Sequence, residues 1–259
     1  MPQFDRYIGI DYSGAQTPRS SLKGLQVYEA AAGLQAYEVL PPPSPRKYWT
    51  RQGIAQWLVE QLAPDVPTIV GIDHGFSFPM AYFEAHALAL DWDAFLDDFQ
   101  YHWPTDGEYL YVDFVRYGDH GEAAKRQGNA RWRRLCETRC RAKSVFHFDV
   151  QGSVAKSTHA GIPWLRYVRS QTSHRLHAWP FDGWDIAAGD SAILEAYPAL
   201  YKRDFAPEAR TPDQHDAYSI ASWLRDADQD GRLQHALHPP LSDDDKKLAM
   251  IEGWILGVT

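Results

Sequence analysis

The chain has 259 residues, of which 44% are hydrophobic and 23% charged, and this composition is typical of a folded globular protein rather than a disordered one. No stretch approaches the roughly 18 consecutive apolar residues of a membrane span, and the first residues lack the regions of a signal peptide, so we expect a cytoplasmic protein with no membrane partner. The net charge of -8 weighs against a polyanionic partner. However, thirteen Lys or Arg and only four acids lie between residues 116 and 175, and this segment either meets a charged partner or is an ordinary solvated basic surface.

The first third of the chain predicts four strands and one helix. An apolar run ends in Asp11, and two further β-like runs cover 24–31 and 34–40, with a turn at Gly33 between them. A proline cluster follows, an amphipathic helix begins near Thr50, and a buried strand over 68–73 ends in Asp73. Three strands, a helix and a fourth strand reached by a crossover favour an α/β fold.

The middle of the chain predicts a helical insertion, at about 80–141, into a single domain of residues 1–259. Helices are expected over 80–90, 92–101 and 122–141, and a strand over 109–117. Cys136 and Cys140 are the only cysteines and have no second pair to complete a zinc site, so we expect reduced, structural thiols.

Regular α/β order returns late in the chain. A strand over 192–196 carries Glu195, and a helix opens with Asp213 and Asp216. A last helix begins after Ser242, a suitable N-cap, and is expected to run to about Gly257.

The acids of these elements are candidate metal ligands. Asp11 and Asp73 each end an apolar strand, where the crevice beyond the strand ends is the usual ligand site of an open α/β sheet. Asp213 and Asp216 are three apart on a helix and share one face, and Glu195 is a fifth candidate. Hard cations such as Mg²⁺ or Mn²⁺ prefer such oxygen ligands, and two ions roughly 4 Å apart would activate water and stabilise a leaving oxygen. Alternatively, each acid alone could be a turn or helix-capping residue.

Residues 152–161 are a candidate phosphate-binding segment. Small residues, a lysine and two hydroxyls precede a helix expected from about Ile162, and backbone N–H groups there could cradle a phosphate. The spacing is not that of a Walker loop, and a surface loop before an ordinary helix is the alternative. Lys143 and Lys156 are the best candidates for phosphate contacts, and His159 could relay a proton. We expect Arg126, Arg133, Arg134, Lys143 and Lys156 to border the metal cleft, and Ser157, Thr158 and His159 to contact substrate.

The layout of acids resembles that of ribonuclease-H-like nucleases, and most closely that of Holliday-junction resolvases. In addition, the motifs IGIDYSG, GIDHGFSFP, GSVAKSTHAGIPWL, ILEAYPALY, DQHDAYSIASWL and EGWILG resemble the family called domain of unknown function 429, a predicted ribonuclease-H-like nuclease. The resemblance spans 7–257 but does not cover 80–141. It implies a mixed sheet flanked by helices, with a metal-binding and catalytic set of Asp11, Asp73, Glu195 and Asp216. Resolvases more often have Glu where this chain has Asp73.

Three functions are compatible with these residues. The first is a divalent-metal-dependent nuclease acting on DNA or RNA. The second is a phosphohydrolase or related enzyme acting on a nucleotide or phosphorylated metabolite, which the acidic overall charge favours. The third is a non-catalytic nucleic-acid-binding protein that uses the Arg-rich insertion alone.

Overall fold

The computed structural model describes residues 2–42, 47–62, 65–172 and 176–259, and its centre is one mixed β-sheet. The strand order is β3-β2-β1-β4-β6-β5. Strand β2 pairs antiparallel with both β1 and β3, whereas β4, β6 and β5 run parallel to β1. The strands are β1 Arg6–Asp11, β2 Gln26–Ala31, β3 Tyr37–Glu38, β4 Thr68–Asp73, β5 Leu176–Ala178 and β6 Ser191–Glu195.

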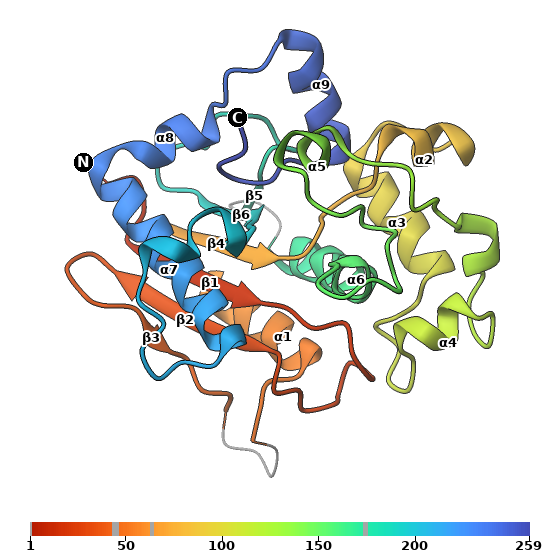
Figure 1. Ribbon diagram of the computed structural model, residues 1–259, viewed down its shortest axis with the longest axis horizontal. Coiled ribbons are helices and arrows are strands. Elements are labelled where there is room, and N and C mark those ends of the chain that lie inside the picture. Colours follow the sequence, from red (N-terminus) through yellow and green to blue (C-terminus); the bar gives the residue numbers. More distant parts are fainter. Residues whose placement is uncertain (1, 43–46, 63–64, 173–175) are drawn as a thin grey trace.

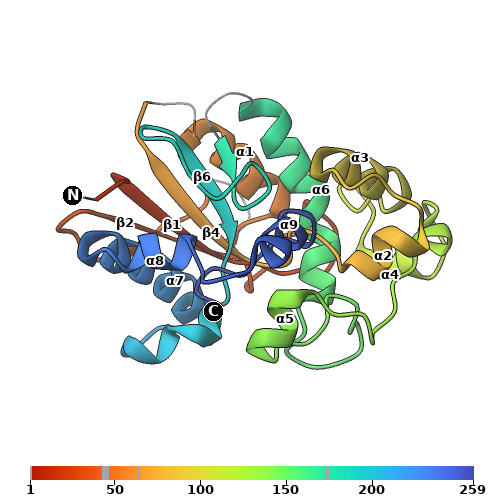
Figure 2. The same ribbon diagram turned by 90° about the horizontal axis from the view of Figure 1, so that it is seen from above.

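Helices cover both faces of the sheet, which confirms the expected α/β class (Figures 1 and 2). One face packs against α1 and α6, and the other packs against α7 and α8. Helices α2 to α4 lie beyond the carboxyl ends of β1 and β4, on the far side of α6, whereas α5 packs against α9. The helices are α1 Arg51–Leu62, α2 Met80–Ala85, α3 Trp92–His102, α4 Val112–Arg116, α5 Leu135–Cys140, α6 Ala155–Thr172, α7 Pro212–Asp230, α8 Arg232–Leu237 and α9 Asp243–Glu252.

The two faces of the sheet follow from strand alternation. Successive side chains of a strand point to opposite faces. Accordingly, Ile8 and Ile10 pack in the layer of α1 and α6, whereas Tyr7 packs in the layer of α7. In β4, Ile72 belongs to the first layer and Ile69 to the second. This alternation also decides where the acids at the strand ends point.

Two glycines let α7 lie directly against the sheet. Gly9 and Gly71 are paired in register on the neighbouring strands β1 and β4. A Cβ atom at Gly9 would overlap the backbone of Ala217, and one at Gly71 would overlap Ile220. The first turns of α7 are therefore held close above the ends of these two strands.

The middle of the chain differs most from expectation. The predicted helix over 122–141 is wrong, because the structure has only a 3₁₀ turn, Ala123–Arg126, and the short α5, with Gly128 between them against the ring of Phe146. The predicted strand over 109–117 is also wrong. That segment contains α4, whose buried Val112 and Val115 have helical spacing. Both cysteines lie in or at the end of α5 as free thiols.

Several other boundaries differ less. The helix expected from about Ile162 begins at Ala155, and the last helix ends at Glu252 rather than near Gly257. The edge strand β5 was not expected. Within the described ranges, the structure contains no helix with the length and apolar character that a bilayer crossing requires.

Candidate metal centre

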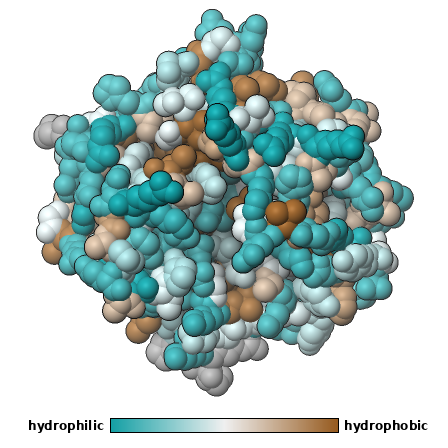
Figure 3. Space-filling model, viewed as in Figure 1, coloured by the Kyte–Doolittle hydropathy of each residue, from teal (hydrophilic) through white to brown (hydrophobic). Residues whose placement is uncertain are grey.

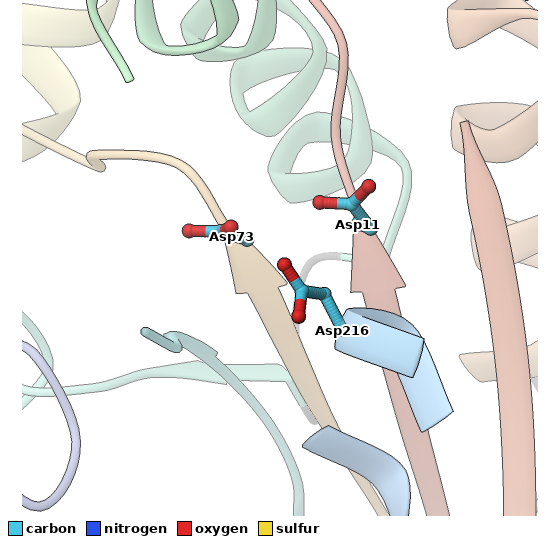
Figure 4. Close-up of side chains that lie close together, drawn as sticks. All are labelled: Asp11, Asp73 and Asp216. Atoms are coloured by element: carbon cyan, nitrogen blue, oxygen red, sulfur yellow. The ribbon is translucent and has the colours of Figure 1, made fainter. Parts of the chain in front are cut away.

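Three carboxylates converge at the carboxyl edge of the sheet. Each of Asp11, Asp73 and Asp216 offers one oxygen, and these three oxygens all lie within 4.8 Å of one another. Figure 4 shows the three side chains pointing into a common space, from the tips of β1 and β4 and from α7. Their separation in sequence shows that only the fold brings them together.

The register of the sheet explains this convergence. Asp11 pairs directly with Asp73 across the parallel strands β1 and β4. Both residues have the same alternation as Gly9 and Gly71, so their side chains point to the face that α7 covers. Asp216 lies early in α7, whose start is fixed by a capping box in which the Thr211 side chain accepts from the Gln214 N–H.

Crowding of negative charge perturbs the acids of this centre. Burial raises the pKa of Asp73 from 3.8 to about 8, with further contributions from Asp216 and Glu195. Burial and the neighbouring acids Asp73, Asp213 and Asp216 hold the pKa of Asp11 well above its usual range. The positive charge around these carboxylates is therefore too small to offset their burial and their mutual repulsion.

Lys202 supplies the positive charge that the structure does place there. It lies in the 3₁₀ turn Lys202–Asp204, and its Nζ donates to both oxygens of Asp216 at 2.9 and 3.2 Å. It lowers the pKa of Asp11 and of Asp73, but less than the opposing effects raise them. Sequence reasoning missed Lys202, although it follows the strand that carries Glu195 and therefore emerges at the same edge of the sheet.

Tyr201 is a second residue of the centre that sequence reasoning missed. Its ring is buried and stacks on Trp223 at 4.9 Å. Its hydroxyl has no hydrogen-bond partner among the described residues. Burial and the charges of Asp73 and Asp216 raise the pKa of this hydroxyl well above its usual range, so the group lies in the field of the same carboxylates.

The structure does not bring Glu195 into the group of three. Glu195 pairs in register with Ile72 rather than with Asp73, and alternation sends its side chain to the opposite face. There it is buried, and its two oxygens accept from the guanidinium of Arg134 at 2.6 and 2.7 Å. The Phe76 N–H also donates to it, at 3.3 Å.

A cleft of about 930 Å³ adjoins the centre on the side of Asp11. Asp213, which is outside the group of three, lines this cleft together with Asp11, Ser157 and Lys156. Lys156 is ion-paired with Asp113 at 2.6 Å. In the space-filling view, a hollow near the middle of this face is bordered mainly by hydrophilic side chains (Figure 3). Its polar lining suits a hydrophilic substrate better than an apolar one.

Two of the expected substrate contacts are buried away from the cleft. Thr158 accepts a hydrogen bond from the Gly75 N–H at 2.9 Å and has no exposed surface. His159 is surrounded by aromatic rings, including those of Phe78 and Trp103, and burial lowers its pKa to about 3. A histidine that stays neutral in an apolar layer packs the core and does not relay protons to the cleft.

The basic residues expected around the cleft differ in their positions: some lie near the acids or are exposed, and others are held in ion pairs. Lys143 lies beside Asp73 and Glu195 in a small pocket, where it donates to the Gln151 carbonyl, and Arg133 is exposed. Arg134 is instead buried in its pair with Glu195, and Arg126 pairs with Asp98 on α3 at 2.7 Å. Arg126 and Arg134 therefore do not form a basic rim of the large cleft, contrary to expectation.

Comparisons of the chain with protein-family models, with curated proteins and with solved structures gave no match.

Proposed function

We propose that this chain has a ribonuclease-H-like fold and hydrolyses phosphodiester bonds in DNA or RNA, with Mg²⁺ or Mn²⁺ held by Asp11, Asp73 and Asp216. The convergence of these three carboxylates carries the proposal. The sheet order supports the fold, because an antiparallel β1–β2–β3 meander is followed by α1 and by strands parallel to β1. The sequence motifs that resemble domain of unknown function 429 support the same assignment.

The residues present fit a hard divalent cation. All three candidate ligands are carboxylates, the donor type that Mg²⁺ and Mn²⁺ prefer, and their oxygens are close enough to share one ion. The raised pKa values of Asp11 and Asp73 indicate that positive charge is in deficit there.

The chain's own residues provide the other requirements of phosphodiester hydrolysis. When bound, the divalent ion supplies Lewis-acid stabilisation of charge on the phosphate and lowers the pKa of water. Lys156 and Ser157 line the cleft beside Asp11 and are placed to hold a phosphate group. Lys202 orients the Asp216 side chain by its two hydrogen bonds.

One observation favours the second candidate, an enzyme acting on a nucleotide or other phosphorylated metabolite. Several cations of the basic segment are neutralised by acids, so less positive charge is free to follow a nucleic-acid backbone than the sequence count indicates. These pairs are Arg116–Asp149, Arg126–Asp98, Lys156–Asp113, Arg166–Asp97, and Arg169 with Asp93 and Asp182.

Replacing Asp11 or Asp73 by Asn tests the function. Asn keeps the shape of the side chain but removes the charge that holds the ion, so we expect Mn²⁺-dependent cleavage of DNA or RNA to fall by at least about 100-fold, while the far-UV CD spectrum is unchanged. Asp244→Asn, which removes an exposed carboxylate in α9, is the matched control and should keep wild-type activity.

The substrate panel separates the three functions. It should contain single strands, duplexes and junctions of DNA and RNA, together with mononucleotides. Cleavage that survives in both Asn variants would contradict the proposal. Phosphate release from mononucleotides alone would favour the metabolite enzyme, and salt-sensitive binding without turnover would favour the non-catalytic binding protein.

A further inference from the structure

The geometry of Lys202 bears on how many ions the centre holds. Its ammonium group donates to both oxygens of Asp216, at 2.9 and 3.2 Å. It lies close enough to Asp11 and Asp73 to lower the pKa of each. A cation supplied by the chain is therefore already part of the carboxylate cluster.

Arg134 accounts for the remaining acid at this edge. Both oxygens of Glu195 bind the guanidinium of Arg134, at 2.6 and 2.7 Å, and the pair is buried. Glu137 holds the same guanidinium through Nε at 3.0 Å, which fixes the orientation of Arg134. Releasing Glu195 to bind a metal would leave a buried guanidinium with one of its two carboxylates, at a large cost.

These contacts leave three carboxylates and one ammonium group. With all three acids ionised and Lys202 protonated, the cluster carries two negative charges in excess, and one divalent ion balances them. A second ion roughly 4 Å from the first would need further carboxylate oxygens and would be repelled by the Lys202 ammonium. Asp213 is outside the group of three, and burial and the charge of Asp216 raise its pKa while Lys23 lowers it.

We infer that the centre binds a single divalent ion, and that Lys202 takes the place of a second one. This inference rests on the proposed function for the site itself, and it revises the expectation of two ions. Lys202 is thus a positioning residue, since it acts through Asp216. Its ammonium group compensates the negative charge of the carboxylates and, unlike an ion, cannot dissociate from the protein.

Mn²⁺ binding to the whole chain tests the inference without an activity assay. Isothermal titration gives the number of ions per chain, and electron paramagnetic resonance detects spin coupling between two Mn²⁺ ions that are about 4 Å apart. We expect the wild type to bind one ion with no coupled signal. Lys202→Met keeps the length of the side chain but removes its charge. Its dissociation constant for a second Mn²⁺ ion should be at least about 10-fold lower than that of the wild type, and the variant should give the coupled signal.

Two control variants sharpen the result. Arg203→Met removes an exposed positive charge from the same 3₁₀ turn and should bind one ion, as the wild type does. Glu195→Gln should also bind one ion with affinity within about 2-fold of the wild type, because Glu195 is held by Arg134 and not by the metal.

Two outcomes would overturn the inference while leaving the metal centre in place. One is a coupled pair of Mn²⁺ ions in the wild type. The other is a Lys202→Met variant that binds no more Mn²⁺ than the wild type. A wild-type chain that binds no Mn²⁺, or that binds it equally well after Asp11→Asn, would instead contradict the proposed function and the inference with it.

Discussion

At the end of β4, Asp73 faces two other carboxylates, whereas at the end of the neighbouring strand β6, Glu195 faces a guanidinium. Burial and the neighbouring acids raise the pKa of Asp73 to about 8. In the second group the guanidinium of Arg134 pairs with both Glu195 and Glu137. Two acids at the same edge of one sheet therefore have different electrostatic surroundings.

Strand alternation is the origin of this difference. Asp73 points to the face of α7 and meets Asp216, whereas Glu195 points to the opposite face and meets the guanidinium of Arg134. Glu252 belongs to the same buried group, where it accepts from the N–H groups of Met80 and Leu135. The Arg134 group thus links the middle of the chain to its C-terminal helix, while the Asp73 group is the proposed ion site.

The largest effect is expected from breaking the Arg134 group. Arg134→Met leaves Glu195 and Glu137 buried without their cation, so the free energy of unfolding should fall by about 3–5 kcal/mol. Urea denaturation measures this change. Adding Glu137→Gln and Glu195→Gln to the Arg134→Met variant removes the two carboxylate charges that have no cation. This triple variant should regain part of the lost free energy of unfolding. A loss below about 1 kcal/mol for Arg134→Met would show that the pair is not the main link between these segments.

A smaller effect is expected from moving the helix that delivers Asp216. Gly9→Ala places a methyl group against the backbone of Ala217 in α7, so we expect a loss of about 1–3 kcal/mol and a smaller Mn²⁺-induced rise in melting temperature. Gly24→Ala is the control, because a Cβ there makes only ordinary contacts, and it should change stability by less than about 0.5 kcal/mol. Equal stability of both variants would contradict the close packing of α7 on β1.

The last comparison concerns pH. Because the pKa of Asp73 is raised from 3.8 to about 8 by folding, its contribution to the stability of the metal-free protein becomes less favourable as pH rises from about 4 to about 8. Asp73→Asn lacks this contribution, so it should match the wild type near pH 4 and become progressively more stable than the wild type as the pH rises to 8. Melts in the presence of a chelator measure this, with Asp244→Asn as the control. A variant that is less stable than the wild type at pH 8 would indicate a structural role for the Asp73 charge.

Much of the sheet and all three site acids follow from local sequence signals. The apolar runs that end in Asp11 and Asp73 predict parallel strands whose ends meet, and the Thr211–Pro212 start of α7 places Asp216 in its first turns. The expected location of Glu195 at the same edge is also confirmed. Which face it points to depends on the register of β6 against β4, and that register is set by long-range packing that the sequence does not show.

The middle of the chain could not be predicted, for a similar reason. Arg134 has extended backbone and precedes α5 rather than lying within a long helix, because its side chain is drawn into the core by Glu195. In the sequence it is one of several arginines with the appearance of an exposed basic surface. Its partner is 61 residues away, so helical periodicity cannot reveal the pair.

The position of Asp11 opposite Asp73 also favours one register of the two central strands, β1 and β4. In the observed register, Ile8 and Ile10 enter the apolar layer of α1 and α6, and the acid that follows them points away from it. A slip of β1 by one residue would exchange the two faces and drive the Asp11 carboxylate into that apolar layer, at the cost of removing its charge from water. The Asp11 carboxylate is costly to bury in the native sheet, but its burial in a misaligned sheet would be less favourable still. Asp11 therefore favours the observed register of β1.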